Sequence, residues 1–217
     1  MITAALEGLA LGASLIIAIG AQNAYVIRQG VKGEHVFAVA MVCALIDIVL
    51  ISVGAAGVGT LIAHSPVLRT GAAWGGALFL IVFGIISVRA AIAAKPGAWE
   101  KAEHDAAEHD GDERGASASR LKSTVVAAAA FSLLNPHVYL DTVVVLGGIA
   151  AQYELHARVW FALGAMSASL IWFFGIGYGA TKVAPCFRTV TGTRVLETVV
   201  ATIMFALAVS LIMGELR

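Results

Sequence analysis

The sequence has few charged residues. Asp, Glu, Lys and Arg make up only 13% of the 217 residues, whereas a soluble domain carries about 25%. The formal net charge is +0, and no basic stripe runs along the chain to favour nucleic-acid binding. Hydrophobic residues account for 59% of the chain. These proportions exclude an ordinary soluble domain and indicate an integral membrane protein that lies in a lipid bilayer.

Cysteine is also scarce. Cys43 and Cys186 lie far apart, so they form neither a disulfide framework nor a C-x-x-C redox pair. No nucleophile–base or metal-ligand spacing indicates an enzyme, and we expect no catalysis, no cofactor and no bound metal. A cleaved signal peptide is not expected, because Met1 to Leu11 contains no Lys or Arg.

Six apolar runs have about the length that crosses a bilayer, roughly 20 residues. They are Ile2–Ile27, Val36–Ala63, Gly71–Ala94, Thr124–Ala151, Ala157–Thr181 and Leu196–Met213. The polar segment 95–122 separates the first three from the last three. We therefore predict an all-α membrane protein with six transmembrane helices, divided into residues 1–94, a cytoplasmic linker 95–122 and residues 123–217. His104 and His109 in the linker do not share a helical face, so we expect a solvated, largely disordered segment rather than a metal site.

The distribution of Lys and Arg predicts the orientation. Eleven of them fall in the first, third and fifth loops: Arg28, Lys32, Arg89, Lys95, Lys101, Arg114, Arg120, Lys122, Lys182, Arg188 and Arg194. The opposite side holds Arg69, Arg158 and Arg217. Because cytoplasmic loops carry the excess of positive charge, both termini are predicted outside. A first segment that fails to span would instead give five crossings and a cytoplasmic amino terminus.

The two halves show weak internal similarity. Gly20–Ala24 can be laid over Asn135–Tyr139, Ala44–Asp47 over Ser169–Trp172, and Phe83–Ser87 over Phe205–Val209. The three matches keep the same order. Since each half has an odd number of predicted spans, equivalent helices would run in opposite directions, as in inverted-repeat transporters. We expect two inverted three-helix repeats.

Polar residues interrupt the first and fourth runs. Pro136 lacks a backbone donor, so it should break the fourth helix, and Gly20 is the matching soft point in the first. Broken backbone at membrane depth is tolerated where protein or a water-filled cavity satisfies it. Gln22, Asn23, Asn135 and His137 would line such a cavity. The alternative is that these side chains only hold helices together, and His137 could be a proton group or a packing residue.

Asp47 and Asp141 lie deep inside apolar stretches, and no Lys or Arg sits at comparable depth. An ionisable side chain there costs roughly 3 kcal/mol on insertion scales, so it is rarely without function. Two acids without a basic partner favour a cation, a proton or both. The alternative is a neutral, hydrogen-bonded acid, or a pair reached by Arg89 from the end of the third run.

Three glycine patterns predict close helix packing. They are Gly8-x-x-x-Gly12, Gly71-x-x-x-Gly75 and Gly175-x-Gly177-x-Gly179. None has the strand–turn–helix context of a nucleotide-binding loop.

At these residues the chain resembles the LysE family of amino-acid exporters, in particular its lysine/arginine branch. The resemblance rests on Gly20-Ala21-Gln22-Asn23-Ala24-Tyr25-Val26-Ile27-Arg28-Gln29-Gly30 and on Leu134-Asn135-Pro136-His137-Val138-Tyr139-Leu140-Asp141-Thr142. One departure is Ala21, where the family commonly has proline. The resemblance implies proton-driven export of lysine and arginine across the bacterial inner membrane by a multi-pass protein. It also implies that Asn23, Asp47 and Asp141 are functionally sensitive.

A basic amino acid carries one net positive charge, which Asp47 and Asp141 could balance while Gln22, Asn23 and Asn135 hold its α-groups. Burial favours the protonated carboxyl, so Asp47 or Asp141, with His137, would carry the coupled proton. Proton and substrate competing for one acid would give antiport. The alternatives are export of a neutral amino acid or another small amine, and transport of a divalent cation. The sequence is compatible with a homodimer but does not decide the oligomeric state.

Overall fold

The computed structural model describes residues 1–17, 20–58, 66–94, 113–187 and 189–215. Every regular element within these ranges is a helix. Three of the described helices are long and apolar enough to cross a membrane: Val36–Gly57, Leu155–Phe187 and Val190–Ser210. The first two helices together would make a fourth span. The predicted all-α membrane class is confirmed, while the count of six spans stays a prediction.

The first apolar run is broken at the predicted glycine. Helix α1 (Ile2–Ile16) ends before residues 18–19, and helix α2 (Ala21–Lys32) begins after Gly20, at 82° to α1. Gly20 is extended, with φ −118° and ψ 178°, and no side chain caps α2. A glycine break without proline therefore suffices to turn the chain.

The second and third runs form long helices. Helix α3 (Val36–Val53) continues into a π-helical turn, η1 (Gly54–Val58), which ends near Gly57 at φ 93°. Helix α5 spans Pro66–Ala93. Residues 59–65, the end of the predicted second run, lie outside the described residues.

The fourth run is also broken where proline predicts it. Helix α7 (Glu113–Leu133) ends, Leu134 and Asn135 are not helical, and α8 (Pro136–Tyr139) begins at the proline. The π-helical turn η2 (Leu140–Leu146) and helix α9 (Gly147–Ala150) follow. Helix α7 begins inside the segment for which we expect a linker, and residues 95–112 of that segment lie outside the described part.

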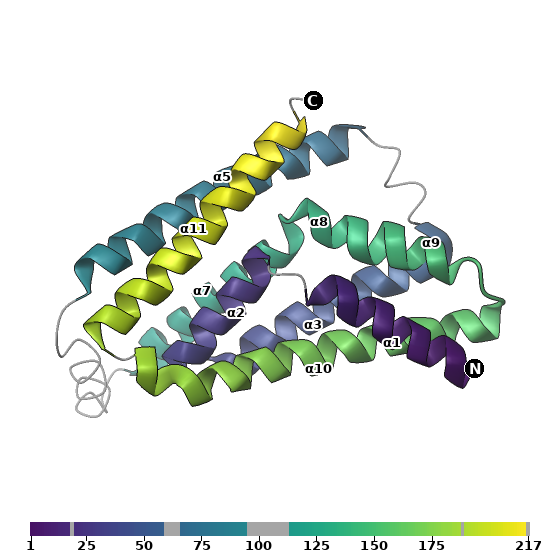
Figure 1. Ribbon diagram of the computed structural model, residues 1–217, viewed down its shortest axis with the longest axis horizontal. Helices are drawn as coiled ribbons and strands as arrows, with labels where there is room; N and C mark the ends of the chain where they lie inside the picture. Colours follow the sequence, from purple (N-terminus) through teal and green to yellow (C-terminus); the bar gives the residue numbers. More distant parts are fainter. Residues whose placement is uncertain (18–19, 59–65, 95–112, 188, 216–217) are drawn as a thin grey trace.

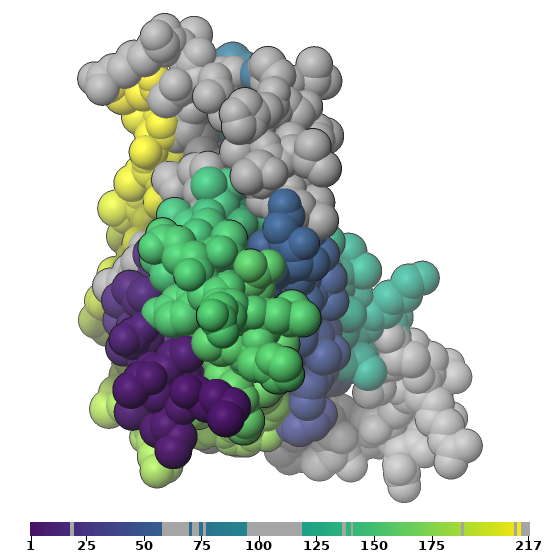
Figure 2. Space-filling model, turned by 90° about the vertical axis from the view of Figure 1, so that its right-hand side faces the viewer, coloured from purple at the N-terminus to yellow at the C-terminus, as the bar shows by residue number. Residues whose placement is uncertain are grey.

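Helices from the first half of the chain pack against helices from the second half. Helix α10 (Leu155–Phe187) runs along α1, α2 and α3, and α11 (Val190–Glu215) lies side by side with α5 (Figure 1). Figure 2 shows α1 against the beginning of α10 at one end of the molecule. A core of Tyr25, Phe131, Phe173 and Met204 joins α2, α7, α10 and α11.

Small residues set the closest of these approaches. A Cβ on Gly8 would lie 1.9 Å from the carbonyl oxygen of Phe161 on α10, so the predicted packing of α1 through Gly8-x-x-x-Gly12 is confirmed. A Cβ on Gly54 would lie 2.8 Å from the Thr142 carbonyl oxygen, which lets η1 contact η2. In the pattern Gly175-x-Gly177-x-Gly179 the expected close packing is confirmed at Gly177, because a Cβ on Gly30 of α2 would lie 2.3 Å from its carbonyl oxygen. At Gly75 and Gly175 it is wrong, since a Cβ there would meet nothing within 4 Å among the described residues.

Candidate functional site

A cavity of about 190 Å³ lies where the two breaks in the helices meet. One water needs roughly 15 Å³ measured in this way, so the cavity has room for many waters or a small molecule. Its lining comes from both halves of the chain: Leu15, Ile16, Gly20, Ala21, Gln22, Asn23, Asp47, Leu80, Asn135, Val138, Asp141, Thr142, Phe173 and Leu207. An apolar wall with a few convergent polar groups is the usual form of a small-molecule site.

The structure brings the predicted polar residues together. Gln22, Asn23, Asp47, Asn135 and Asp141 all line this cavity, and so does Gly20 at the first break. Pro136 begins α8 at the second break. The side chain of His137 lies outside the described part of the structure, so its predicted role stays a prediction.

Asp47 is the more deeply buried of the two acids that line the cavity, and the residue is only 2% exposed. Its Oδ2 accepts a 2.6 Å hydrogen bond from the Ser169 hydroxyl on α10. Its Oδ1 has no hydrogen-bond partner among the described residues. Asp141, at the start of η2, is close enough for the two carboxyl groups to interact electrostatically. The pair therefore offers an acceptor and negative charge to the cavity.

Gln22 supplies the complementary group. Its amide nitrogen Nε2 is buried and lacks a hydrogen-bond partner among the described residues. A buried donor or acceptor left unpaired costs about 1–3 kcal/mol. An unpaired donor on Gln22 and an unpaired acceptor on Asp47 in one cavity suit a ligand or ordered water that carries both kinds of group.

The amino terminus of α2, at the first break, adds positive potential to the donor that Gln22 supplies. Gly20, Ala21, Gln22 and Asn23, the first turn of α2 and the residue before it, line the cavity. The backbone N–H groups of a first helical turn have no partner within the helix, and the helix dipole adds to their positive potential. The amino terminus of α2 can therefore receive an anionic group such as a carboxylate.

Asn23 stabilises the break as well as lining the cavity. Its Nδ2 donates a 2.9 Å hydrogen bond to the carbonyl oxygen of Ile16, the last residue of α1. Its Oδ1 accepts a 3.2 Å bond from the indole nitrogen of Trp172. A carbonyl freed by the break is thus satisfied by a side chain of the next helix, which makes Asn23 a positioning residue.

The second break uses the same arrangement. The Tyr139 hydroxyl, on α8, donates a 2.8 Å hydrogen bond to the carbonyl oxygen of Leu133, the last residue of α7. Freed carbonyl groups at membrane depth need such partners. Sequence reasoning did not identify Ser169, Trp172 or Tyr139, although the first two lie in the segment that aligns with Ala44–Asp47 and Tyr139 in the one that aligns with Gly20–Ala24.

Two basic side chains lie elsewhere than expected. Arg89 is exposed on α5 and does not line the cavity, so the alternative in which it neutralises the two acids is not supported. Arg28, counted above as a loop charge, is buried and pairs with Glu197. Glu197 lies near the start of the last apolar run, where interfacial water would be expected to surround it, but it is only 1% exposed.

The described chain is an all-helical membrane protein in which interrupted helices enclose a cavity that several polar side chains line. These are the features of a transport protein. The LysE type translocator family matches residues 13–215, and the chain belongs to that family.

The relatives include the arginine exporter protein ArgO of Serratia proteamaculans (strain 568), which is 39% identical over 97% of each chain. ArgO of Salmonella schwarzengrund (strain CVM19633) is 37% identical over 97% of this chain and 94% of its own length. ArgO of Shigella flexneri is 38% identical over 94% and 91%. No solved structure matches the chain.

Proposed function

We propose that this protein exports basic amino acids, arginine foremost, across the bacterial inner membrane by proton antiport. One observation carries the proposal: a single cavity presents an acidic pair, a buried unpaired acceptor on Asp47 and a buried unpaired donor on Gln22. Membership of the family and the relatives that are named arginine exporters support the same substrate class.

The cavity suits the charges of a basic amino acid. The α-carboxylate would bind the amino terminus of α2 and the Gln22 amide, as half-helix termini bind substrate carboxylates in other transporters. Asp47 and Asp141 would then balance the α-ammonium and the cationic side chain. The amino acid carries one net positive charge, so it binds when the acidic pair is deprotonated, and a proton takes its place on the pair after it leaves. Asn135 would orient the α-groups from the second break.

We propose that the fold is a pair of inverted three-helix repeats. In this arrangement α1–α2, α3 and α5 form the first repeat, and α7–α9, α10 and α11 the second. The packing supports it, because α1 of the first repeat lies on α10, α7 of the second lies on α3, and α5 and α11 pair with each other. A pseudo-two-fold axis that lies in the membrane plane relates such contacts. The cavity lies between the two broken helices, where this symmetry would place a substrate.

Coupling to protons answers an energetic need. Moving one positive charge outward against a negative-inside potential costs about 2.3 kcal/mol per 100 mV. Exchange of one proton for one arginine is electroneutral and removes that cost. If the proton and the passenger occupy the same acidic pair in turn, neither crosses without the other.

Counterflow with the purified protein in proteoliposomes tests the proposal. Radiolabelled arginine should exchange, and unlabelled arginine or lysine should compete where leucine and Mn²⁺ do not. A pH-sensitive dye should report one proton entering for each arginine that leaves. Competition by leucine would favour the neutral amino-acid alternative, competition by Mn²⁺ the divalent-cation alternative, and arginine exchange without proton movement would reject antiport.

In everted vesicles the KM for arginine should rise as the pH on the cytoplasmic side falls. The reason is that the proton occupies the acid that the passenger needs. A single shared site gives a limiting slope of about tenfold per pH unit. A KM that is independent of pH would contradict competition for one acid.

A further inference from the structure

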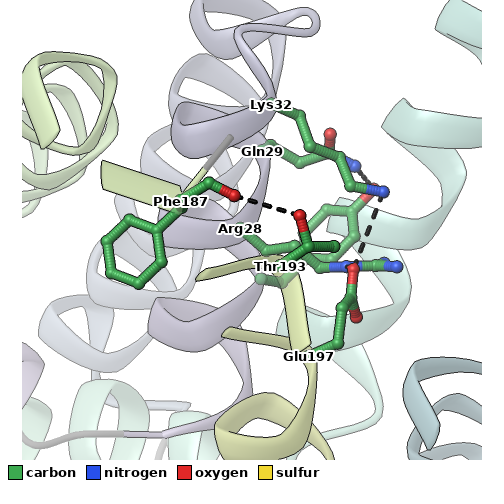
Figure 3. Close-up of polar contacts among 7 residues, drawn as sticks. Arg28, Gln29, Lys32, Phe187, Thr193 and Glu197 are labelled. Atoms are coloured by element: carbon green, nitrogen blue, oxygen red, sulfur yellow. Dashed lines mark hydrogen bonds and ion pairs between the residues drawn. The ribbon is translucent and has the colours of Figure 1, made fainter. Parts of the chain in front are cut away.

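A second buried charge cluster lies beside the cavity, between α2 and α11. Arg28 Nε donates a 2.8 Å hydrogen bond to Oε1 of Glu197, and the Lys32 Nζ lies 3.8 Å from the same oxygen (Figure 3). Arg28 is 7% exposed and Glu197 1%. The guanidinium carbon of Arg28 also lies 5.2 Å from the centre of the Phe83 ring. A carboxylate and an aromatic face together form a favourable site for a guanidinium group.

The cluster lies on one side of the cavity. Arg28 follows Asn23 by five positions on α2, and Glu197 precedes Leu207 by ten on α11, and both Asn23 and Leu207 line the cavity. At 1.5 Å per residue this places them roughly 8 Å and 15 Å along their helices from the cavity lining. This is the end of the bundle that the excess of Lys and Arg assigns to the cytoplasm. A passenger that enters the cavity from the cytoplasm would pass the cluster.

Aromatic rings pack beside the cluster. The rings of Tyr25 and Phe83 lie 4.7 Å and 4.6 Å from that of Phe131, centre to centre. Tyr25 stands between Gln22 and Arg28 on α2. Its hydroxyl accepts a 2.9 Å hydrogen bond from the Gln29 amide and donates to the Thr124 carbonyl oxygen. The Phe83 ring beneath the Arg28 guanidinium is therefore part of a packed aromatic group that joins α2, α5 and α7.

The ion pair between Arg28 and Glu197 uses only one of the two carboxylate oxygens. Structural arginine–carboxylate pairs are frequently bidentate, but here Arg28 and Lys32 share Oε1. Oε2 of Glu197 and Oε1 of Gln29 are buried without a hydrogen-bond partner among the described residues. Two unpaired acceptors beside the pair leave hydrogen-bonding capacity that the donors of another cation could use.

We propose that Glu197 and the Phe83 ring form a second site for a guanidinium or ammonium group, filled by Arg28 in this structure. The exported amino acid takes this site from Arg28 on its way to the cavity. This inference rests on the proposed function, since it needs a cationic passenger. Arg28 thus competes with the passenger for one carboxylate.

Competition predicts opposite effects from the two halves of the same ion pair. In everted vesicles, where the cytoplasmic face is outside, Arg28→Gln should lower the KM for arginine about fivefold or more, because the nearer of the two internal cations is gone and only the more distant Lys32 remains. Glu197→Gln should raise the KM by a similar factor, because the site has lost its charge. Arg158→Gln is the matched control. Arg158 donates a hydrogen bond to the Ala150 carbonyl oxygen at the α9–α10 turn, away from the cluster, so this variant should have the KM of the wild type.

The outcomes separate the inference from the proposed function. If the wild-type protein does not carry arginine, both fail. If it does, but Arg28→Gln and Glu197→Gln move the KM in the same direction or not at all, the pair only holds α2 to α11 and the second site alone is rejected. Should Arg28→Gln fail to fold, Arg28→Lys should lower the KM by a smaller factor, because an ammonium fits the ring and carboxylate less well. An unchanged KM in that variant would overturn the inference.

Discussion

The Ser169 hydroxyl on α10 and the Asp47 carboxylate on α3 join the two halves of the chain beside the cavity, with 2.6 Å between their oxygens. Both residues are buried. Ser169 satisfies Oδ2 and so leaves Oδ1 as the oxygen without a partner among the described residues. The bond therefore fixes which side of the carboxylate is offered to a ligand.

Ser169→Ala should weaken arginine export without abolishing it. The change leaves Asp47 Oδ2 without its donor, which costs about 1–3 kcal/mol for a buried group. We expect the KM for arginine in everted vesicles to rise about tenfold, which corresponds to 1.4 kcal/mol. Ser169→Thr keeps the hydroxyl and is the control, with a KM near that of the wild type. Equal loss in both variants would mean that packing, not the hydrogen bond, is responsible.

Asp47→Asn should abolish the export of cationic amino acids. The amide removes a buried negative charge at almost constant volume, and loss of one partner from a buried charge pair costs about 2–5 kcal/mol, or roughly 30-fold or more in affinity. Asp141→Asn should have the same direction of effect. Counterflow of radiolabelled arginine measures both. Normal exchange in either variant would show that the acid is a hydrogen-bonded structural group.

The sequence predicted the cavity better than it predicted the helix packing. Pro136 and Gly20 have local backbone consequences that need no neighbour, so both breaks were correctly predicted. Asp47 and Asp141 stood out because charge is costly in an apolar run. These effects depend on a residue and its immediate sequence, and such effects can be recognised without coordinates.

The misjudged residues depend on contacts between distant segments. Glu197 lies near the end of an apolar run, and only the fold brings Arg28 to it, 169 residues away. Gly75 and Gly8 occupy similar glycine patterns, yet only Gly8 faces another backbone. Asn23 was recognised as polar in the right place, but its bond to the Ile16 carbonyl depends on the 82° turn between α1 and α2. Periodicity and composition do not specify such pairings.

Asn23→Ala should destabilise the protein more than Trp172→Phe does. The alanine leaves both the Ile16 carbonyl oxygen and the Trp172 indole nitrogen without their partner, whereas phenylalanine removes only the second bond. Each lost bond to a partly buried group costs about 1–3 kcal/mol. Thermal unfolding of the detergent-solubilised proteins gives the comparison. A Tm for Asn23→Ala equal to that of the wild type would exclude a role in stabilising the break.

Gly8→Ala and Gly75→Ala form a matched pair of substitutions. The new methyl group at Gly8 would lie 1.9 Å from the Phe161 carbonyl oxygen, so α1 must move away from α10, whereas at Gly75 it meets nothing within 4 Å. Overpacking of this kind costs about 1–3 kcal/mol. We expect Gly8→Ala to lower the Tm in detergent by several degrees and Gly75→Ala to leave it unchanged or slightly raised, because alanine favours a helix by about 1 kcal/mol over glycine. If Gly8→Ala is as stable as Gly75→Ala, α1 does not contact α10 as closely as the structure shows. The positions of Leu15 and Ile16 of α1 in the wall of the cavity would then also be wrong.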